Sequence, residues 1–371
     1  FAAALEEDAQ GADVRAAEVE REEGAVLLAA RKSCIGAEHT ERCALFARKP
    51  RAHIGAEIIG DFAERIVVYG DYDVDGITAT SLLCRNLRQL GATAGYFIPH
   101  RQKDGYGLHK ETLDEIIAGG ANLIVTVDCG ISAVEEAAAA KDKVDLIITD
   151  HHLPGKELPK AFAVIDPHRA DCAYPDKNIA GVGVAFKLCQ ALWQKMRGKD
   201  FAGDLDIVAL GTVADVVPLL GENRKIVQQG LRVLKKSKRL GLQALLAVTE
   251  LQEKEITAGH IGFVLAPRLN AAGRLASALR GVELLLTEDG EEAQAIAEEL
   301  DAANRERQAV EQEILQAAEK QIEEIDVKRA HVLVLHGEGW HPGVIGIVAS
   351  RIVERYYRPT IVIAEEDGIG K

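Results

Sequence analysis

The sequence predicts an α/β protein in which a parallel sheet with helices on both faces is joined by a long helix to a second, smaller α/β domain. Short, wholly apolar segments alternate with helical segments of about ten to fifteen residues, which is typical of a parallel sheet. A helical stretch with an apolar stripe then runs from 291 to about 325. After it, the pattern predicts a strand, a helix and a strand at 331–335, 343–356 and 360–364.

Composition limits the class of protein. The chain has 371 residues, of which 47% are hydrophobic, but no apolar run approaches the ~20 residues that cross a membrane. The six cysteines form no CxxC pair, which favours free thiols in a reducing cytoplasm. With a net charge of −14, the protein must meet any polyanionic substrate with metal ions or clustered Arg and Lys. Residues 1–50 read as a helical extension without a secretory signal.

The first predicted strand, 66–69, runs directly into three aspartates at alternate positions: Asp71, Asp73 and Asp75. In an extended segment, side chains two positions apart share a face, so these carboxylates would repel one another unless a cation lies between them. We expect Gly76 to allow a tight turn into a helix over 77–90. An acidic surface turn is the alternative interpretation.

Two later strands are also followed directly by an aspartate. Asp128 follows the strand 123–127, and Asp150, His151 and His152 follow the strand 146–149. Ligands of open α/β sheets bind beyond the carboxyl ends of the strands, so we expect these side chains to converge with the first three aspartates. Asp215 ends an apolar helix over 206–215, where an acid is costly unless it is paired or bound to a metal.

A further strand, 162–165, is followed by Asp166, Pro167 and His168. Here we favour a turn with a solvated histidine over a contribution to the site.

The chemistry that suits the converging side chains is hydrolysis of a phosphate ester by two divalent cations. Carboxylates with one or two imidazoles favour Mn²⁺ or Mg²⁺, whereas a structural zinc site would use thiolates. A carboxylate between two ions can bridge them for an in-line displacement, and Asp128 is the candidate bridge. The chain contains no Walker loop, GxGxxG or GxSxG motif, which leaves nucleotide-cofactor and serine-nucleophile functions without support.

Four segments resemble, in order, the motifs of the DHH phosphoesterase superfamily: 70–76, 127–130, 149–152 and 211–219. Two further stretches, 266–275 and 339–351, are similar to the bacterial branch that degrades single-stranded DNA. The resemblance runs from about residue 67 to the last residue. It implies a DHH domain over 51–300, a connecting helix over 301–326 and the start of an incomplete DHHA1 domain over 327–371. Because members of this branch continue into a glycine-rich segment and an OB-fold, we expect the sequence to be a fragment.

The resemblance also implies roles for individual residues. Two divalent cations, Mn²⁺ or Mg²⁺, would be held by Asp73, Asp75, Asp128, His151 and Asp215. His152 would face the substrate phosphate and Arg274 would bind it, while Asp71 and Asp150 would support the ligands from behind. Further candidates for substrate contact are Arg268, Asn270 and His341, the last of which could instead cap the helix that starts at Pro342.

The activity implied is degradation of single-stranded DNA from the 5′ end to mononucleotides, in DNA repair and recombination. Its partners would be single-stranded DNA, a single-strand-binding protein and a helicase, and the protein would be a monomer. A phosphodiesterase of the same superfamily acting on short oligoribonucleotides or cyclic dinucleotides is the main alternative. A non-catalytic replication scaffold is disfavoured because every ligand position is filled, and a pyrophosphatase because Tyr69 stands where that branch has a histidine.

Overall fold

The computed structural model of the protein describes residues 65–101, 104–275, 277–366 and 368–371. Its larger sheet has five parallel strands in the order β2-β1-β3-β4-β5. Their bounds are β1 Arg65–Tyr69, β2 Thr93–Phe97, β3 Leu123–Val127, β4 Asp145–Thr149 and β5 Ala163–Ile165. Every strand that the alternating pattern predicted is present, which confirms the predicted α/β class.

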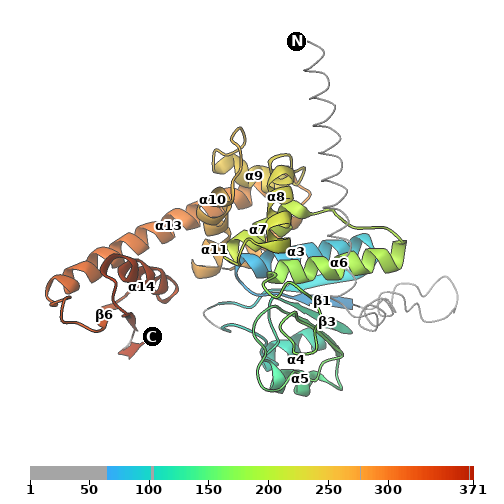
Figure 1. The fold of residues 1–371 in the computed structure, drawn as a ribbon, viewed down its shortest axis with the longest axis horizontal. Coiled ribbons are helices and arrows are strands. Elements are labelled where there is room, and N and C mark those ends of the chain that lie inside the picture. Colours follow the sequence, from blue (N-terminus) through green and yellow to red (C-terminus); the bar gives the residue numbers. More distant parts are fainter. Residues whose placement is uncertain (1–64, 102–103, 276, 367) are drawn as a thin grey trace, which may run out of the picture.

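Helices cover both faces of this sheet (Figure 1). Helices α3 (Val74–Gln89) and α6 (Gly181–Arg197) lie on one face, and α4 (Lys110–Ala118) and α5 (Val134–Ala140) lie on the other. Alternate residues of one strand therefore enter different cores: Val125 packs into the core with α3 and α6, whereas Ile124 packs into the core with α4 and α5. Because both faces are buried, the strands are apolar throughout.

A group of helices packs beside α3 and α6 and completes the main body (Figure 1). It consists of α7 (Leu205–Ala214), α8 (Gly221–Lys235), α9 (Leu240–Val248), α10 (Ala258–His260), the π-helical turn η1 (Ile261–Leu265), α11 (Ala266–Leu275) and α12 (Leu279–Leu286). Helix α7 is apolar on all sides because it packs between α3, α6 and α8. This placement brings its carboxyl end, with Asp215, to the edge of the sheet.

The long helix α13 (Gly290–Glu323) joins two hydrophobic cores. Its amino half contributes Ile296 and Leu300 to the main core, and its carboxyl half contributes Ile314 and Ile322 to a second one. The helix begins at Gly290, one residue before the helical stretch predicted from 291, and the Asp289 side chain caps it by accepting from the backbone N–H groups of Glu291 and Glu292.

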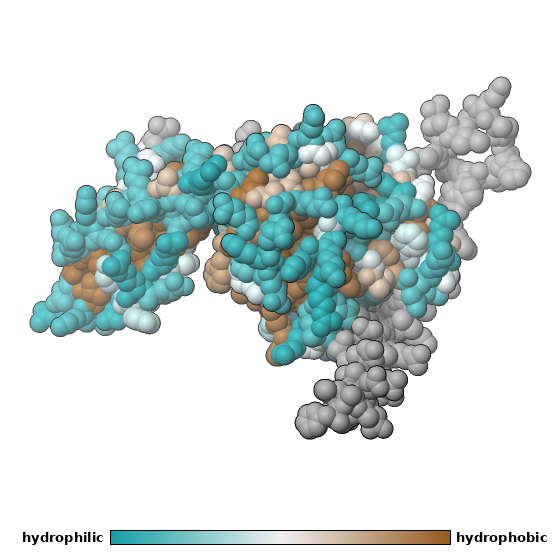
Figure 2. All heavy atoms as spheres, turned by 90° about the horizontal axis from the view of Figure 1, so that it is seen from above, coloured by the Kyte–Doolittle hydropathy of each residue, from teal (hydrophilic) through white to brown (hydrophobic). Residues whose placement is uncertain are grey.

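The second core belongs to a small unit at the far end of α13 (Figure 1). This unit contains the strands β6 (Leu333–Glu338), β7 (Thr360–Glu366) and β8 (Ile369–Gly370) and the helix α14 (Pro342–Tyr356). Strands β6 and β7 are parallel and β8 is antiparallel to β7. In the space-filling view of Figure 2, the molecule is hollowed between this smaller lobe and the main body.

Some predictions lie outside the described residues. The helical extension predicted for 1–50 is one, and Cys34 and Cys43 are others. Within the described part of the chain, Cys84, Cys129, Cys172 and Cys189 are free thiols, as predicted. None of the helices in that same part combines the length and apolarity needed to span a bilayer.

Candidate metal centre

The site is built at the carboxyl edge of the sheet, from residues that follow three neighbouring strands. Asp71 lies just beyond β1, Asp128 directly follows β3, and Asp150 directly follows β4. Strand β3 pairs with both β1 and β4, so the three aspartates are brought side by side. The convergence expected from the sequence is therefore present.

The first acidic motif folds differently from the predicted extended segment. Helix α3 begins at Val74, Asp73 caps it by accepting a hydrogen bond from Gly76 N at 3.0 Å, and Asp75 lies in its first turn. The expectation that all three carboxylates line one face of a strand is thus wrong. Gly76 is inside the helix, where a Cβ atom would lie 2.4 Å from the Asp71 carbonyl oxygen.

Asp75 is held by the amino end of α6. Its two carboxylate oxygens accept hydrogen bonds from Gly181 N at 2.6 Å and from Val182 N at 2.8 Å. Unpaired N–H groups and the helix dipole stabilise a carboxylate at such a position. A Cβ atom on Gly181 would lie 2.5 Å from Asp128 Oδ1, so this helix can approach the acids only with glycine there. The sequence reasoning missed this contact, although the pair Gly181 and Gly183 was its visible signal.

The imidazole of His151 lies among three carboxylates from different elements. Its Nε2 is 3.0 Å from Asp128 Oδ1, 3.7 Å from Asp215 Oδ2 and 3.8 Å from Asp75 Oδ2. Asp215 reaches this point from the end of α7. Ligand atoms within 4.8 Å of one another form overlapping groups: Asp71, Asp73 and Asp128; Asp75, His151 and Asp215; Asp128, His151 and His152.

Several of these atoms are buried without hydrogen bonds. Among the described residues, Asp71 Oδ1, Asp128 Oδ1, His151 Nε2 and Asp215 Oδ2 are buried side-chain atoms that make none. Buried polar atoms are normally satisfied, and unsatisfied ones call for an explanation such as a bound ion. Acids and one imidazole from four segments, with open lone pairs pointing at one another, fit hard divalent cations.

The electrostatics of the cluster point the same way. Burial raises the pKa of Asp75 to about 7, with a further contribution from Asp73, and raises that of Asp71 to about 7 for the same two reasons. Burial, followed by Asp75, raises the pKa of Asp215 to about 7 and that of Asp128 well above its ordinary value. Burial lowers the pKa of His151, so this imidazole is neutral and able to bind a metal. The cluster is short of positive charge.

Backbone geometry at two of these positions is also unusual. Asp128 has φ 62° and Val216, directly after Asp215, has φ 61°. Left-handed conformations are rare for residues other than glycine, and especially for a β-branched residue such as valine. Strained backbone of this kind gathers at functional sites, where the surrounding structure holds it in place.

Asp150 orients His152 rather than His151. One carboxylate oxygen lies 2.7 Å from His152 Nδ1 and also accepts from His151 N, while the other accepts from Ile131 N. This hydrogen bond is the main cause that raises the pKa of His152 to about 8, so the ring is protonated at neutral pH. Burial would raise the pKa of Asp150, but hydrogen bonds and the charge of His152 outweigh it and lower the pKa. Tyr106 Oη lies 3.1 Å from the same His152 Nδ1.

The predicted substrate residues take varied positions. Arg274, on α11, donates from Nη1 to the Gly343 carbonyl of the second lobe at 2.8 Å. Arg268 donates to Asp301 at 2.8 Å, and Asn270 Oδ1, on α11, is a buried atom without a hydrogen bond in the described structure. His341 caps α14 by accepting from Gly343 N.

Sequence reasoning also overlooked Arg101. Its guanidinium stacks over the Tyr72 ring at 4.7 Å, directly beside the first acidic motif.

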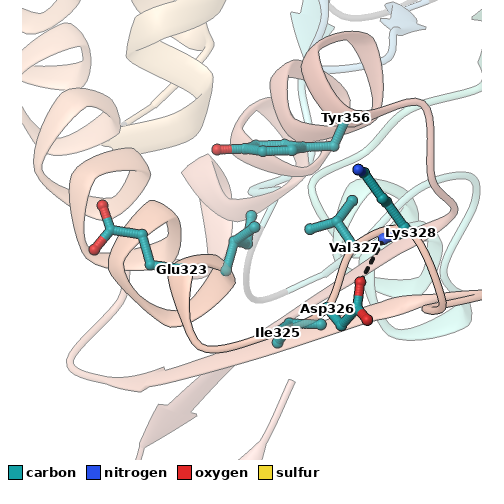
Figure 3. Close-up of a pocket in the computed structure, with 7 residues that line it drawn as sticks. Glu323, Ile325, Asp326, Val327, Lys328 and Tyr356 are labelled. Carbon is teal, nitrogen blue, oxygen red and sulfur yellow. Dashed lines mark hydrogen bonds between the residues drawn. The ribbon is translucent and has the colours of Figure 1, made fainter.

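Two other features lie outside the cluster. The turn predicted at 166–168 is present, and its His168 side chain is 23% exposed. Asp166 beside it is 2% exposed, because its carboxylate turns inward to accept from His168 N. Burial raises the pKa of Asp166 to about 7. A pocket of about 600 Å³ lies where α13 and α14 end, between Ile322 and Tyr356 (Figure 3), and no acid of the cluster lines it.

Comparison with known proteins gives consistent results. The model of the DHH family, N-terminal domain, matches residues 65–212. The chain is 45% identical over 311 residues to the single-stranded-DNA-specific exonuclease RecJ of Bacillus subtilis, covering 83% of this chain and 39% of the relative. It is likewise 45% identical over 320 residues to RecJ of Escherichia coli, covering 81% of this chain and 55% of the relative. It spans about half the length of the curated relatives it matches.

Solved structures are also similar to this chain over most of its length. The crystal structure of exonuclease RecJ bound to manganese has a TM-score of 0.77 and 39% sequence identity, and the match covers 88% of this chain and 79% of that one. The structure of RecJ in complex with Mn²⁺ from Thermus thermophilus has a TM-score of 0.74 and 36% identity, with 88% of this chain and 46% of that one covered. From its fold, its motifs and these similarities, the chain belongs to the RecJ family of DHH proteins.

Proposed function

We propose that this protein is a divalent-metal-dependent phosphodiesterase that degrades single-stranded DNA from the 5′ end to mononucleotides, in DNA repair and recombination. The observation that carries the proposal is the acid and histidine cluster at the carboxyl edge of the sheet, with buried atoms that lack partners within the described structure. The printed names of its relatives, which are single-stranded-DNA-specific exonucleases, support the substrate class.

Two ions would be held by Asp73, Asp75, Asp128, His151 and Asp215. Asp128 is the residue that would contact both ions. Related RecJ structures contain Mn²⁺ or Mg²⁺, and the oxygen-rich donor set fits either ion. When bound, the ions would supply Lewis acidity and lower the pKa of water at the reacting phosphate. Asp71, which lies beside Asp73 and Asp128, would support this set from behind.

Other residues would then act on the phosphate directly. His152 carries a proton at neutral pH, and Asp150 holds its Nδ1. Its Nε2 is therefore the nitrogen that can donate to a phosphate oxygen and stabilise the charge that develops there. Arg274 presents a guanidinium from α11, and Arg101 presents another beside Tyr72. Such groups bind phosphate oxygens in pairs.

The remaining parts of the proposal rest on family resemblance. We take 51–300, of which 51–64 lie outside the described residues, as the DHH domain. We take 327–371 as the start of a DHHA1 domain, so that the hollow in Figure 2 is the substrate cleft. Within the cell, we place the protein in the cytoplasm as a monomer that works with a single-strand-binding protein and a helicase.

A single set of digestions tests the proposal. The protein is incubated with Mn²⁺ and either a long single strand or a dinucleotide, and the products are resolved over time. We expect mononucleotides to be released from the 5′ end of the long strand, and Asp128→Ala to abolish this release. The matched control is Asp142→Ala, an exposed acid in the turn before β4, which should retain activity. Preference for the dinucleotide, or full activity in Asp128→Ala, would contradict the proposal.

A further inference from the structure

The middle of α13 carries buried polar residues where its two ends carry apolar ones. Asp301, Asn304, Arg307 and Glu311 are all at most 8% exposed, and they lie between the apolar residues Leu300 and Ile314 of the two cores. Buried charges are costly unless they are paired. Apolar side chains would be enough to pack the two lobes together, so the polar residues of this stretch call for an explanation.

The charges in this stretch do not balance. Arg307 donates to Glu311 from within α13, and Arg351 of α14 forms a salt bridge with the same carboxylate. Nearby, Arg268 and Arg305 likewise share the single carboxylate of Asp301. Each acid is thus shared by two guanidinium groups. In a chain with a net charge of −14, this is a local excess of positive charge.

One donor in this stretch is buried without an acceptor. In the described part of the chain, Arg307 Nε makes no hydrogen bond, although Arg307 is only 8% exposed. Its two terminal nitrogens are held by Glu311 and Asn304. Arg351, in contrast, has a side chain that is 57% exposed, so it is accessible to a ligand from solvent.

Arg307 acts electrostatically on Arg274, the residue predicted to bind the substrate phosphate. Arg274 contacts the second lobe at the Gly343 carbonyl. Burial, followed by the positive charges of Arg101 and Arg307, lowers the pKa of Arg274 to about 10, so both of those charges act on it. Arg351 in turn lowers the pKa of Arg307, after burial. We call Arg274, Arg307 and Arg351, with Glu311, the arginine seam.

We propose that the arginine seam is a second phosphate subsite, in which Arg351 binds a backbone phosphate of the strand whose terminal phosphate lies at the metal centre. The inference rests on the proposed function, since it takes single-stranded DNA as the substrate. Glu311 keeps the guanidinium groups of Arg307 and Arg351 in position and competes with the phosphate for Arg351. Arg351 is the residue that touches the strand, and Arg307 is a positioning residue that acts through Glu311.

A purely structural role would be to hold α14 against α13, and the chain offers a matched control for it. Arg355, one turn beyond Arg351 on α14, forms a salt bridge with Glu319 of α13, and its side chain is 63% exposed. Both pairs link the same two helices, but only Arg351 belongs to the seam. Arg351→Gln, Arg355→Gln and Glu311→Gln therefore separate phosphate binding from helix packing.

The measurement is kcat/KM for a single strand of about twelve nucleotides, with Mn²⁺, across a range of salt concentrations. Each phosphate contact contributes about −0.7 to the slope of log affinity against log salt for single strands. Arg351→Gln should lower kcat/KM roughly three- to tenfold at low salt, through KM, and make the slope shallower by about 0.7. Arg355→Gln should match the parent, and Glu311→Gln should raise kcat/KM because it removes the competing charge.

The outcomes are distinguishable. If the parent does not hydrolyse the strand, the proposed function fails and the inference fails with it. If the parent is active but Arg351→Gln keeps the parent slope, or if Glu311→Gln and Arg355→Gln lose activity together with it, the seam has a packing role and the inference alone is overturned.

Discussion

Replacing Asp215 by asparagine should stabilise the metal-free protein at alkaline pH. Burial and the neighbouring Asp75 raise its pKa from 3.8 to about 7, and among the described contacts its Oδ2 makes no hydrogen bond that asparagine would lose. A pKa raised by this amount corresponds to roughly 4 kcal/mol of lost stability above pH 7. The side chain is 20% exposed, and solvent screening reduces the expected gain to about 1–2 kcal/mol.

The sign follows from where the proton binds more tightly. Folded Asp215 holds its proton more strongly than the unfolded chain does, so this stability is fully present below about pH 4 and is lost as pH rises through 7. Parent and Asp215→Asn should therefore unfold alike in acid and differ most at pH values above 7. Urea unfolding in EDTA measures the difference, and the exposed Asp142→Asn should show none.

Adding Mn²⁺ should reverse the order of stability. A ligand that binds only the folded state adds about 2.7 kcal/mol at a concentration of 100 times its Kd, and the parent should gain this more fully than a variant that has lost a ligand. The same variant should lose nuclease activity. An Asp215→Asn protein that is less stable than the parent in EDTA at alkaline pH would refute the reasoning, because the carboxylate would then be satisfied without an ion.

Three further predictions concern the residues around the cluster. In Asp150→Asn, the pKa of His152 should fall from about 8, because the charged hydrogen bond with Asp150 that mainly raises it is removed. The alkaline limb of the kcat–pH profile should therefore move to lower pH. An unchanged limb would count against His152 as a proton-bearing group. Gly181→Ala places a Cβ atom 2.5 Å from Asp128 Oδ1, so the Mn²⁺ affinity measured by calorimetry should drop. Gly346→Ala is the control, because its Cβ atom meets no atom within 4 Å. It should keep the Mn²⁺ affinity and add up to about 1 kcal/mol of stability. Asp166→Asn should remove the loss of stability that the parent suffers between about pH 4 and 7 as Asp166 ionises; urea midpoints that fall equally in both proteins would contradict this.

The strands could be predicted from the sequence because both faces of the sheet are buried. A strand such as 123–127 has no polar alternation, and only a parallel sheet between two helical layers accommodates that pattern. Once the strands are known, the rule that parallel strands end at one edge places Asp128 and Asp150 together without any distance information. The order of the small unit, with β6, α14 and β7, was predicted for the same local reasons.

What could not be predicted depends on contacts between distant segments. The spacing of Asp71, Asp73 and Asp75 suits a strand as well as a loop entering a helix, and the choice was decided by the capping of α3 by Asp73. The approach of α6 to Asp75 joins residues more than a hundred positions apart. Nothing in the local sequence distinguishes Arg101 from any other loop arginine, and only the structure shows that it stacks on Tyr72. Local patterns carry no information on such pairs.

The acids of the cluster differ in how many hydrogen bonds their carboxylates accept, and therefore in how much positive charge each still needs. Asp150 accepts from three backbone amides and an imidazole and has a lowered pKa, so it needs no cation and serves to orient His152. Asp75 accepts from two amides but keeps a pKa of about 7, because burial and the charge of Asp73 outweigh those hydrogen bonds. Asp128 and Asp215 each have an oxygen with no donor within the described structure. Asp71 shares this deficit and lies with Asp73 and Asp128, so the fold leaves positive charge to be supplied from outside the chain.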